Sequence, residues 1–232
     1  MTIEDALAAA AVEEIRSGMT VGLGTGRAAA RAIAALARRV GAERLSLACV
    51  ATSRGSEELG RRLGLPMLAI EEAERIDYLF DGADEVDPSL RMLKGRGGAM
   101  TREKIAAHAA ARRVYLVQAA KRVERLGATA PLPIEVLRFG LAATRRALRA
   151  LGLDGPLRGG EYLTDDGNPV IDALLPAGLE LEPLAAALDQ TPGVVGHGLF
   201  LREADLVLVE DAEGRVSRAV RQPSASARST MR

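Results

Sequence analysis

The chain has 232 residues, of which 48% are hydrophobic and 27% are charged, and its 31 Lys and Arg balance its 31 Asp and Glu. These values exclude a wholly disordered chain, and the zero net charge argues against nucleic acid as a partner. One cysteine, Cys49, and two histidines, His108 and His197, exclude an intrachain disulfide and disfavour a zinc site. The apolar stretches are too short to span a bilayer and residues 1–5 are acidic, so we expect a cytoplasmic protein that binds no membrane.

The first half of the chain alternates predicted helices and strands. Apolar residues recur at helical spacing between Ile3 and Ile15, and we expect that helix to end at Gly18. Later helices are predicted from an apolar face over 33–40, from a stretch that ends near Gly64, and over about 101–111. The predicted strands are 20–24, 45–50, 76–80 and 114–117. This alternation predicts a parallel sheet covered on both faces, with ligands at the carboxyl ends of its strands.

The pattern changes after Gly127. Predicted strands and helices then follow in the order β-α-β-β-α-β, which is typical of a ferredoxin-like unit. The strands of this unit are predicted near 134–137, 161–164, 170–173 and 194–195, and its helices near 141–151 and 184–188. One more strand, 206–209, is expected to return to the first sheet, and the polar stretch from Ser217 is expected to be disordered.

The expected fold is therefore α/β, with a Rossmann-like parallel-sheet domain and a smaller α+β domain. The larger, catalytic domain is assigned to residues 1–127 plus about 203–216. The smaller domain is assigned to 128–202, and the disordered tail to 217–232.

A glycine-rich turn, Gly22-Leu23-Gly24-Thr25-Gly26, lies between the first predicted strand and the next helix. Free amides at a helix start can hold a phosphate, although the motif fits neither a full dinucleotide fingerprint nor a P-loop. A tight turn without a ligand is an equal alternative. Arg27 favours an anion site, because a guanidinium matches phosphate geometry; a solvated arginine is the alternative.

A denser cluster of charged residues follows the third predicted strand. Asp81-Gly82-Ala83-Asp84-Glu85 is followed by Lys94-Gly95-Arg96-Gly97-Gly98 and then by Glu103 at a helix start. A carboxylate can remove a carbon-bound proton, and a cation can stabilise the enediolate that forms. Helix caps and turn residues are the alternative for the acids, and an exposed surface lysine is the alternative for Lys121.

These motifs resemble those of the ribose-5-phosphate isomerase A family. The matching segments run in the family's order from about residue 3 to residue 216, and they are Val21–Gly26, Asp81–Pro88, Lys94–Ala99 with Arg102–Lys104, Pro131–Val136 and Pro192–Val195. The resemblance implies an aldose–ketose isomerase, an intramolecular oxidoreductase, that interconverts D-ribose 5-phosphate and D-ribulose 5-phosphate in the non-oxidative pentose phosphate pathway. It also implies a phosphosugar as ligand, no cofactor and no metal, and a homodimer or homotetramer.

Position by position, the resemblance implies that Glu103 is the general base between C1 and C2. It implies that Asp81 assists ring opening and hydroxyl proton transfer, and that Lys94 lies beside the developing oxyanion. Asp84 matches a contact to a substrate hydroxyl, and Lys121 a basic phosphate contact. The further predicted substrate and phosphate contacts are Gly24, Thr25, Gly26, Arg27, Gly82, Ala83, Gly95, Arg96 and Gly97.

The phosphate end departs from the family pattern. The family's loop continues Gly-Thr-Gly-Ser-Thr, whereas this chain has Arg27 and Ala28, and Gln118-Ala119-Ala120 precedes Lys121 in place of Asp-x-Ser or Asp-x-Thr. The first helix also lacks a lysine that some members have. Our hypothesis is that Arg27 supplies the missing phosphate charge. A non-catalytic sugar-phosphate-binding protein, or an enzyme acting on another phosphosugar, is the alternative.

Overall fold

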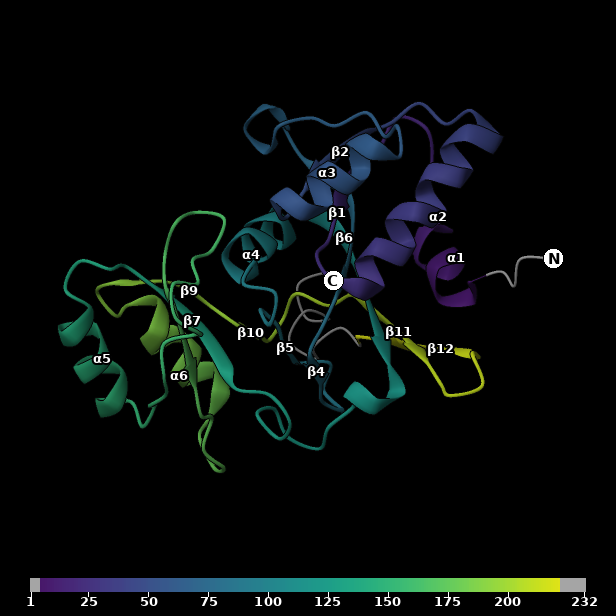
Figure 1. The fold of residues 1–232 in the computed structure, drawn as a ribbon. Helices are drawn as coiled ribbons and strands as arrows, with labels where there is room; N and C mark the ends of the chain where they lie inside the picture. Colours follow the sequence, from purple (N-terminus) through teal and green to yellow (C-terminus); the bar gives the residue numbers. More distant parts are fainter. Residues whose placement is uncertain (1–4, 222–232) are drawn as a thin grey trace, which may run out of the picture.

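The structure, a computed structural model, describes residues 5–221. Its largest sheet has six strands in the order β12-β11-β6-β3-β1-β2 (Figure 1). All neighbouring strands in it are parallel except β12, which runs antiparallel to β11. The strands are β1 (Thr20–Leu23), β2 (Ala48–Ala51), β3 (Ile76–Gly82), β6 (Ala110–Gln118), β11 (Leu206–Glu210) and β12 (Val216–Val220).

Helices cover both faces of this sheet. Tyr78 and Phe80 of β3 point into a core formed with α1 and α2, whereas Leu79 between them points into the opposite core, formed with α4. This period of two along β3 is the signature of a strand that is buried on both sides. The helices are α1 (Ala6–Val12), α2 (Arg27–Glu43), α3 (Arg54–Arg62) and α4 (Met100–Ala109), with the 3-10 turns η1 (Ile70–Glu72) and η2 (Ala119–Lys121).

A smaller antiparallel sheet, in the order β8-β7-β9, lies to one side of the larger one and is packed by α5 and α6 (Figure 1). A short three-stranded sheet, in the order β10-β5-β4, completes the fold. The elements are β7 (Leu132–Val136), α5 (Leu141–Ala150), β8 (Val170–Ala173), α6 (Leu181–Asp189) and β9 (Val194–His197), together with β4 (Glu85–Val86), β5 (Met92–Leu93) and β10 (Leu199–Phe200). The predicted α/β class, with a large parallel sheet and a smaller α+β unit, is confirmed.

The predicted strand at 161–164 is wrong, because no strand lies there. The segment 154–158 runs beside β8 instead: Leu174 N donates to Asp154 O (2.9 Å), Asp172 N to Pro156 O (3.0 Å), and Arg158 N to Val170 O (2.8 Å). Pro156 has no N–H group, so this edge cannot complete a regular ladder. The smaller sheet therefore has three strands.

Two predicted ends are also wrong. The predicted disordered tail begins too early, because residues 216–220 pair with β11 as the half-exposed edge strand β12. Residues 222–232 of that predicted tail lie outside the described residues. The first helix ends at Val12 rather than at Gly18, and Arg39 of α2 binds the carbonyl of Val12 beside that end. Ile3, at its predicted start, lies outside the described residues.

No helix in the range 5–221 combines the length and the apolar character that a membrane crossing requires.

Candidate active site

A cleft of about 800 Å³ opens where β1, β3 and β6 end. Its walls come from the turn after β1, the turn after β3, the loop before α4 and the η2 turn after β6. The lining residues are Thr25, Gly26, Arg27, Ala28, Arg31, Gly82, Ala83, Asp84, Lys94, Gly95, Arg96, Gly97, Glu103, Gln118, Ala120, Lys121, Thr129 and Ala130. Every residue predicted for the site is among them except Gly24 and Asp81, which lie directly behind the wall. The carboxyl edge of the sheet is therefore where the structure gathers the predicted residues.

Three buried charges form the centre of this cleft. Asp81, at the end of β3, is 0% exposed, Lys94 is 2% exposed and Glu103, in the first turn of α4, is 4% exposed. Lys94 Nζ lies 2.9 Å from Asp81 Oδ2 and 3.4 Å from Glu103 Oε2, and it donates to Gly82 O. One lysine thus links two carboxylates that come from different parts of the chain.

The backbone fixes Asp81. Its Oδ1 accepts hydrogen bonds from Thr25 N (2.9 Å) and Gly82 N (2.7 Å), while its Oδ2 faces Lys94. Within the described residues, Asp81 Oδ2 and Glu103 Oε2 have no well-aligned hydrogen bond. These two oxygens therefore retain the capacity to accept a proton or a substrate hydroxyl.

Aromatic rings exclude water from the lysine. The Nζ atom of Lys94 lies 5.5 Å from the centre of the Tyr115 ring and 5.4 Å from that of Phe200. Both rings are fully buried, and their faces are electron-rich and attract a cation. Phe200 comes from β10, far from the other site residues in sequence, so local motifs gave no signal for it.

Burial and neighbouring charge raise the pKa of both Glu103 and Lys94, with different consequences for the two groups. Burial, and then the negative charge of Asp81, raise the pKa of Glu103 above its usual value of 4.5, although the Lys94 ammonium opposes the shift. Burial alone would lower the pKa of Lys94, but Asp81 and Glu103 outweigh it and raise that pKa to about 12. The lysine therefore stays charged at neutral pH, whereas Glu103 is an unusually strong base for a carboxylate.

The turn after β1 must be glycine-rich for a steric reason. A Cβ atom on Gly24 would lie 2.3 Å from Asp81 Oδ1 and 2.5 Å from its Cα. Gly26 has φ of 95° and begins α2 with no side-chain cap, so the first amides of a 17-residue helix have no capping side chain beside the cleft. Such amides attract anions.

Two residues that support this turn were missed by the sequence reasoning. Thr52 Oγ1 lies 2.8 Å from Thr25 Oγ1, and Ser56 Oγ donates to Gly24 O (2.6 Å). Both follow β2, at the same edge of the sheet. Their position after a predicted strand was the available signal. Ser53 is the N-cap of α3 and accepts from Ser56 N (3.1 Å).

Several cations also line the η2 end of the cleft, where Lys121 Nζ donates to Ala83 O, next to the Gly82 carbonyl that Lys94 binds. Burial lowers the pKa of Lys121, and the positive charges of Lys94, Arg27 and Arg96 lower it further, while Asp84 opposes them. Mutual repulsion of this kind is relieved when an anion binds. Arg31 also lines this end, but it already binds Asp5 and Glu210 on two sides.

Glu85, the third acid of the cluster, has a different position. Its side chain is buried and accepts hydrogen bonds from Gly127 N (2.5 Å), Ala130 N (2.9 Å), and both the amide and the hydroxyl of Thr129. It therefore holds the 127–130 loop, which lines the cleft, and it has no free oxygen to act on a ligand.

The histidines and the cysteine are not among the residues that line the cleft. His108 is exposed, whereas His197 is buried and binds Asp189 (3.0 Å); burial and then the Lys104 charge lower the pKa of His197. Burial raises the pKa of the Cys49 thiol to about 12. No group of three or more His, Cys, Asp or Glu residues within 5–221 is arranged to hold a metal ion.

Comparison with known proteins gives a consistent result. Residues 48–214 match the family model described as Ribose 5-phosphate isomerase A (phosphoriboisomerase A). A ribose-5-phosphate isomerase A from Roseiflexus castenholzii is 44% identical over 211 residues, which cover 89% of this chain and 90% of the relative. The chain belongs to the ribose 5-phosphate isomerase A family. The resemblance read from the sequence is confirmed.

Solved structures of the family share the whole fold. The enzyme from Methanocaldococcus jannaschii aligns with a TM-score of 0.87 at 34% identity, covering 92% of this chain and 96% of that one. A D-ribose-5-phosphate isomerase in complex with phospho-erythronic acid aligns with a TM-score of 0.88 at 34% identity, covering 93% and 96%.

The close approach of Gly24 to Asp81 predicts a large effect of a single methyl group. Gly24→Ala is expected to lower the free energy of unfolding by about 1–3 kcal/mol, because neither backbone can yield without moving Asp81. Urea titration measures it. Gly41→Ala is the control: Gly41 lies in α2 with open space around its Cβ position, so alanine should stabilise by about 0.5–1 kcal/mol. Equal stability of the two variants would contradict the steric argument.

The raised pKa of Glu103 predicts a pH-dependent stability. The folded protein holds the Glu103 proton more tightly than the unfolded chain does, so the neutral form stabilises the fold below about pH 4.5, and this contribution is lost as pH rises through the folded pKa. Glu103→Gln should therefore gain stability relative to the wild type as pH rises, and urea titrations across the pH range measure the difference. Glu124→Gln makes the same chemical change at an exposed glutamate outside the cleft and is the matched control. A constant difference between Glu103→Gln and the wild type would refute the shift.

Proposed function

We propose that this chain interconverts D-ribose 5-phosphate and D-ribulose 5-phosphate in the non-oxidative pentose phosphate pathway. The observation that carries the proposal is the buried Asp81–Lys94–Glu103 group at the base of an open cleft. A protein that only binds a sugar phosphate has no need of a desolvated base beside a lysine, since burying such charges is costly. The non-catalytic alternative is therefore not favoured.

The proton transfers follow from this arrangement. The Glu103 carboxylate removes the proton from C2 of the open-chain aldose, and the electron pair moves to form a C1–C2 double bond with an oxyanion at O1. Lys94 stabilises that oxyanion. The O2 proton then passes to O1, and Glu103 returns its proton to C1, which leaves a ketone at C2. Asp81 assists ring opening and the hydroxyl proton transfer, and Asp84 holds a substrate hydroxyl.

The phosphate is placed at the cationic end of the cleft. The first amides of α2 and the side chains of Arg27 and Lys121 line that end. Arg27 replaces the hydroxyl donors of the usual Ser-Thr sequence with a fixed positive charge. Thr25, Gly26 and the remaining predicted glycines bring backbone close to the ligand.

The other expectations remain proposals. We propose that the protein acts as a homodimer or homotetramer in the cytoplasm, without nucleic acid or membrane partners. We also propose that it needs no cofactor or metal, so turnover should persist in a chelator. The division into a domain of 1–127 plus about 203–216 and a domain of 128–202 likewise stays a prediction, with β12 added to the first.

Replacing the proposed base separates catalysis from binding. Glu103→Gln should lower kcat for ribose 5-phosphate by at least about 100-fold, because the amide cannot accept the C2 proton. Calorimetry should still detect ribose 5-phosphate binding. Glu124→Gln serves as the control and should keep wild-type kcat. Undiminished turnover by Glu103→Gln would overturn the assignment of the base, and absence of turnover in the wild type would overturn the function.

Replacing Arg27 tests the phosphate end. Arg27→Ala should raise KM by about tenfold or more and change kcat by much less, because the removed charge binds substrate and transition state alike. The control is Arg38→Ala, an exposed arginine on the same helix that does not line the cleft. Arabinose 5-phosphate and allose 6-phosphate should be run beside ribose 5-phosphate. An unchanged KM would refute the role of Arg27, and preferred turnover of another sugar would assign a different substrate.

A further inference from the structure

A segment of the smaller unit reaches across to the catalytic loop. Residues 157–168, here called the strap, connect the region after α5 to β8. The Nη1 atom of Arg158 donates to Gly95 O and Arg96 O, both at 3.1 Å, and Tyr162 OH donates to Gly97 O at 3.1 Å. Three consecutive carbonyls of the cleft-lining loop are therefore bound by two residues of the strap.

Arg158 is itself held rigidly. Its guanidinium forms a two-pronged ion pair with Asp172 of β8, with Nε to Oδ2 at 2.9 Å and Nη2 to Oδ1 at 2.6 Å. Its Cζ atom lies 5.2 Å from the centre of the Tyr162 ring, and only 15% of its side chain is exposed. A guanidinium has five N–H donors in a planar fork, so it can bind a carboxylate through two parallel bonds and still donate to two carbonyls.

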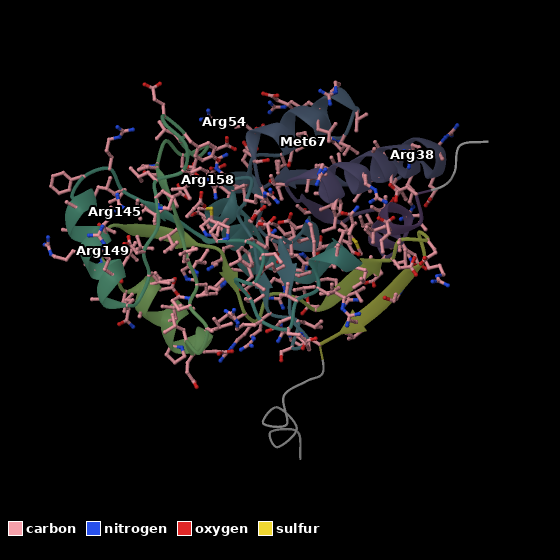
Figure 2. The ribbon with its side chains drawn as sticks, turned by 60° about the horizontal axis from the view of Figure 1, so that its bottom comes forward. Arg38, Arg54, Met67, Arg145, Arg149 and Arg158 are labelled. Atoms are coloured by element: carbon pink, nitrogen blue, oxygen red, sulfur yellow. The ribbon has the colours of Figure 1, made fainter. Side chains whose placement is uncertain are left out.

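The loop is also held from the side of the cleft. Across the loop from Arg158, the Arg96 amide donates to Asp84 Oδ2 (2.9 Å), so the chain is held between the cleft and the strap. Gly98, with φ of 77°, packs so closely on the strap that a Cβ atom there would lie 1.7 Å from Tyr162 OH. Figure 2 places Arg158 on the side of the smaller unit toward the larger sheet, whereas Arg149 lies out on α5.

We infer that Arg158 is a positioning residue for substrate binding, an inference that rests on the proposed isomerase function. It holds the Gly95–Gly97 backbone so that Arg96 and the loop face the cleft. Lys94 has its own anchors, since its amide binds Gly198 O (2.9 Å) and its ammonium binds Gly82 O and Asp81. Loss of Arg158 therefore disturbs the Gly95–Gly97 part of the cleft wall and leaves Lys94 and its carboxylate partners in place.

The test begins with steady-state kinetics of the wild type on ribose 5-phosphate. Arg158→Ala should then raise KM by about tenfold while kcat falls less than about threefold. Arg158→Lys should not restore KM, because an ammonium cannot make the paired contacts. Tyr162→Phe, which removes only the bond to Gly97 O, should raise KM by about twofold to fourfold. Arg149→Ala, an exposed arginine of the same unit, should keep both constants.

Chemical rescue separates positioning from a general loss of structure. Millimolar guanidinium chloride should lower the KM of Arg158→Ala toward the wild-type value, whereas equal sodium chloride should not. A KM for Arg158→Ala within twofold of the wild type overturns the inference. So does a raised KM for Arg158→Ala that guanidinium chloride does not lower, if the KM of Tyr162→Phe also equals that of the wild type. If Arg158→Ala does not fold, the KM of Tyr162→Phe decides alone. A wild type without turnover refutes the proposed function instead.

Discussion

The ion pair of Lys94 with Asp81 and Glu103 is the interaction on which the rest of the structure depends. A buried ammonium is unstable unless negative groups compensate for lost water, and here two carboxylates and a carbonyl do so. The three charged residues come from different elements: Asp81 from the end of β3, Lys94 from the loop before α4, and Glu103 from α4 itself. The buried charges are therefore stable only when the sheet, the loop and the helix are packed together.

The same requirement explains the density of glycine around the site. Asp81 can accept from the Thr25 amide only if β1 and β3 turn within contact distance of each other, and Gly24 is the residue that permits this. The loop that carries Lys94 has positive φ at Gly95 and Gly98 and lies against the strap. Small residues thus let three backbone segments approach, and the charged side chains fill the space between them.

The two ends of the cleft have opposite electrostatic characters. At the base, burial and mutual charge leave Glu103 strongly basic beside a permanently charged Lys94. At the η2 end, the charges of Lys94, Arg27 and Arg96 lower the pKa of Lys121, and these cations can bind an anion. A phosphorylated sugar satisfies both ends at once, with its phosphate among the cations and its reacting carbons over the base. The smaller unit contributes Thr129 and Ala130 to the lining of this cleft, and its strap holds the loop carbonyls from behind.

The amino-acid sequence by itself determined the α/β order of the larger unit and the residues of the cleft, because strand alternation and charged glycine-rich turns are local patterns. It misplaced the fourth strand of the smaller unit, because Pro156 makes an irregular edge that no periodicity reveals, and it missed β12, which is a strand only by pairing with β11. Only the tertiary structure decided that Phe200, Thr52 and Arg158 support the site. These residues are distant in sequence, and their contacts, like the pKa of Glu103, arise from packing and burial that exist only in the folded chain.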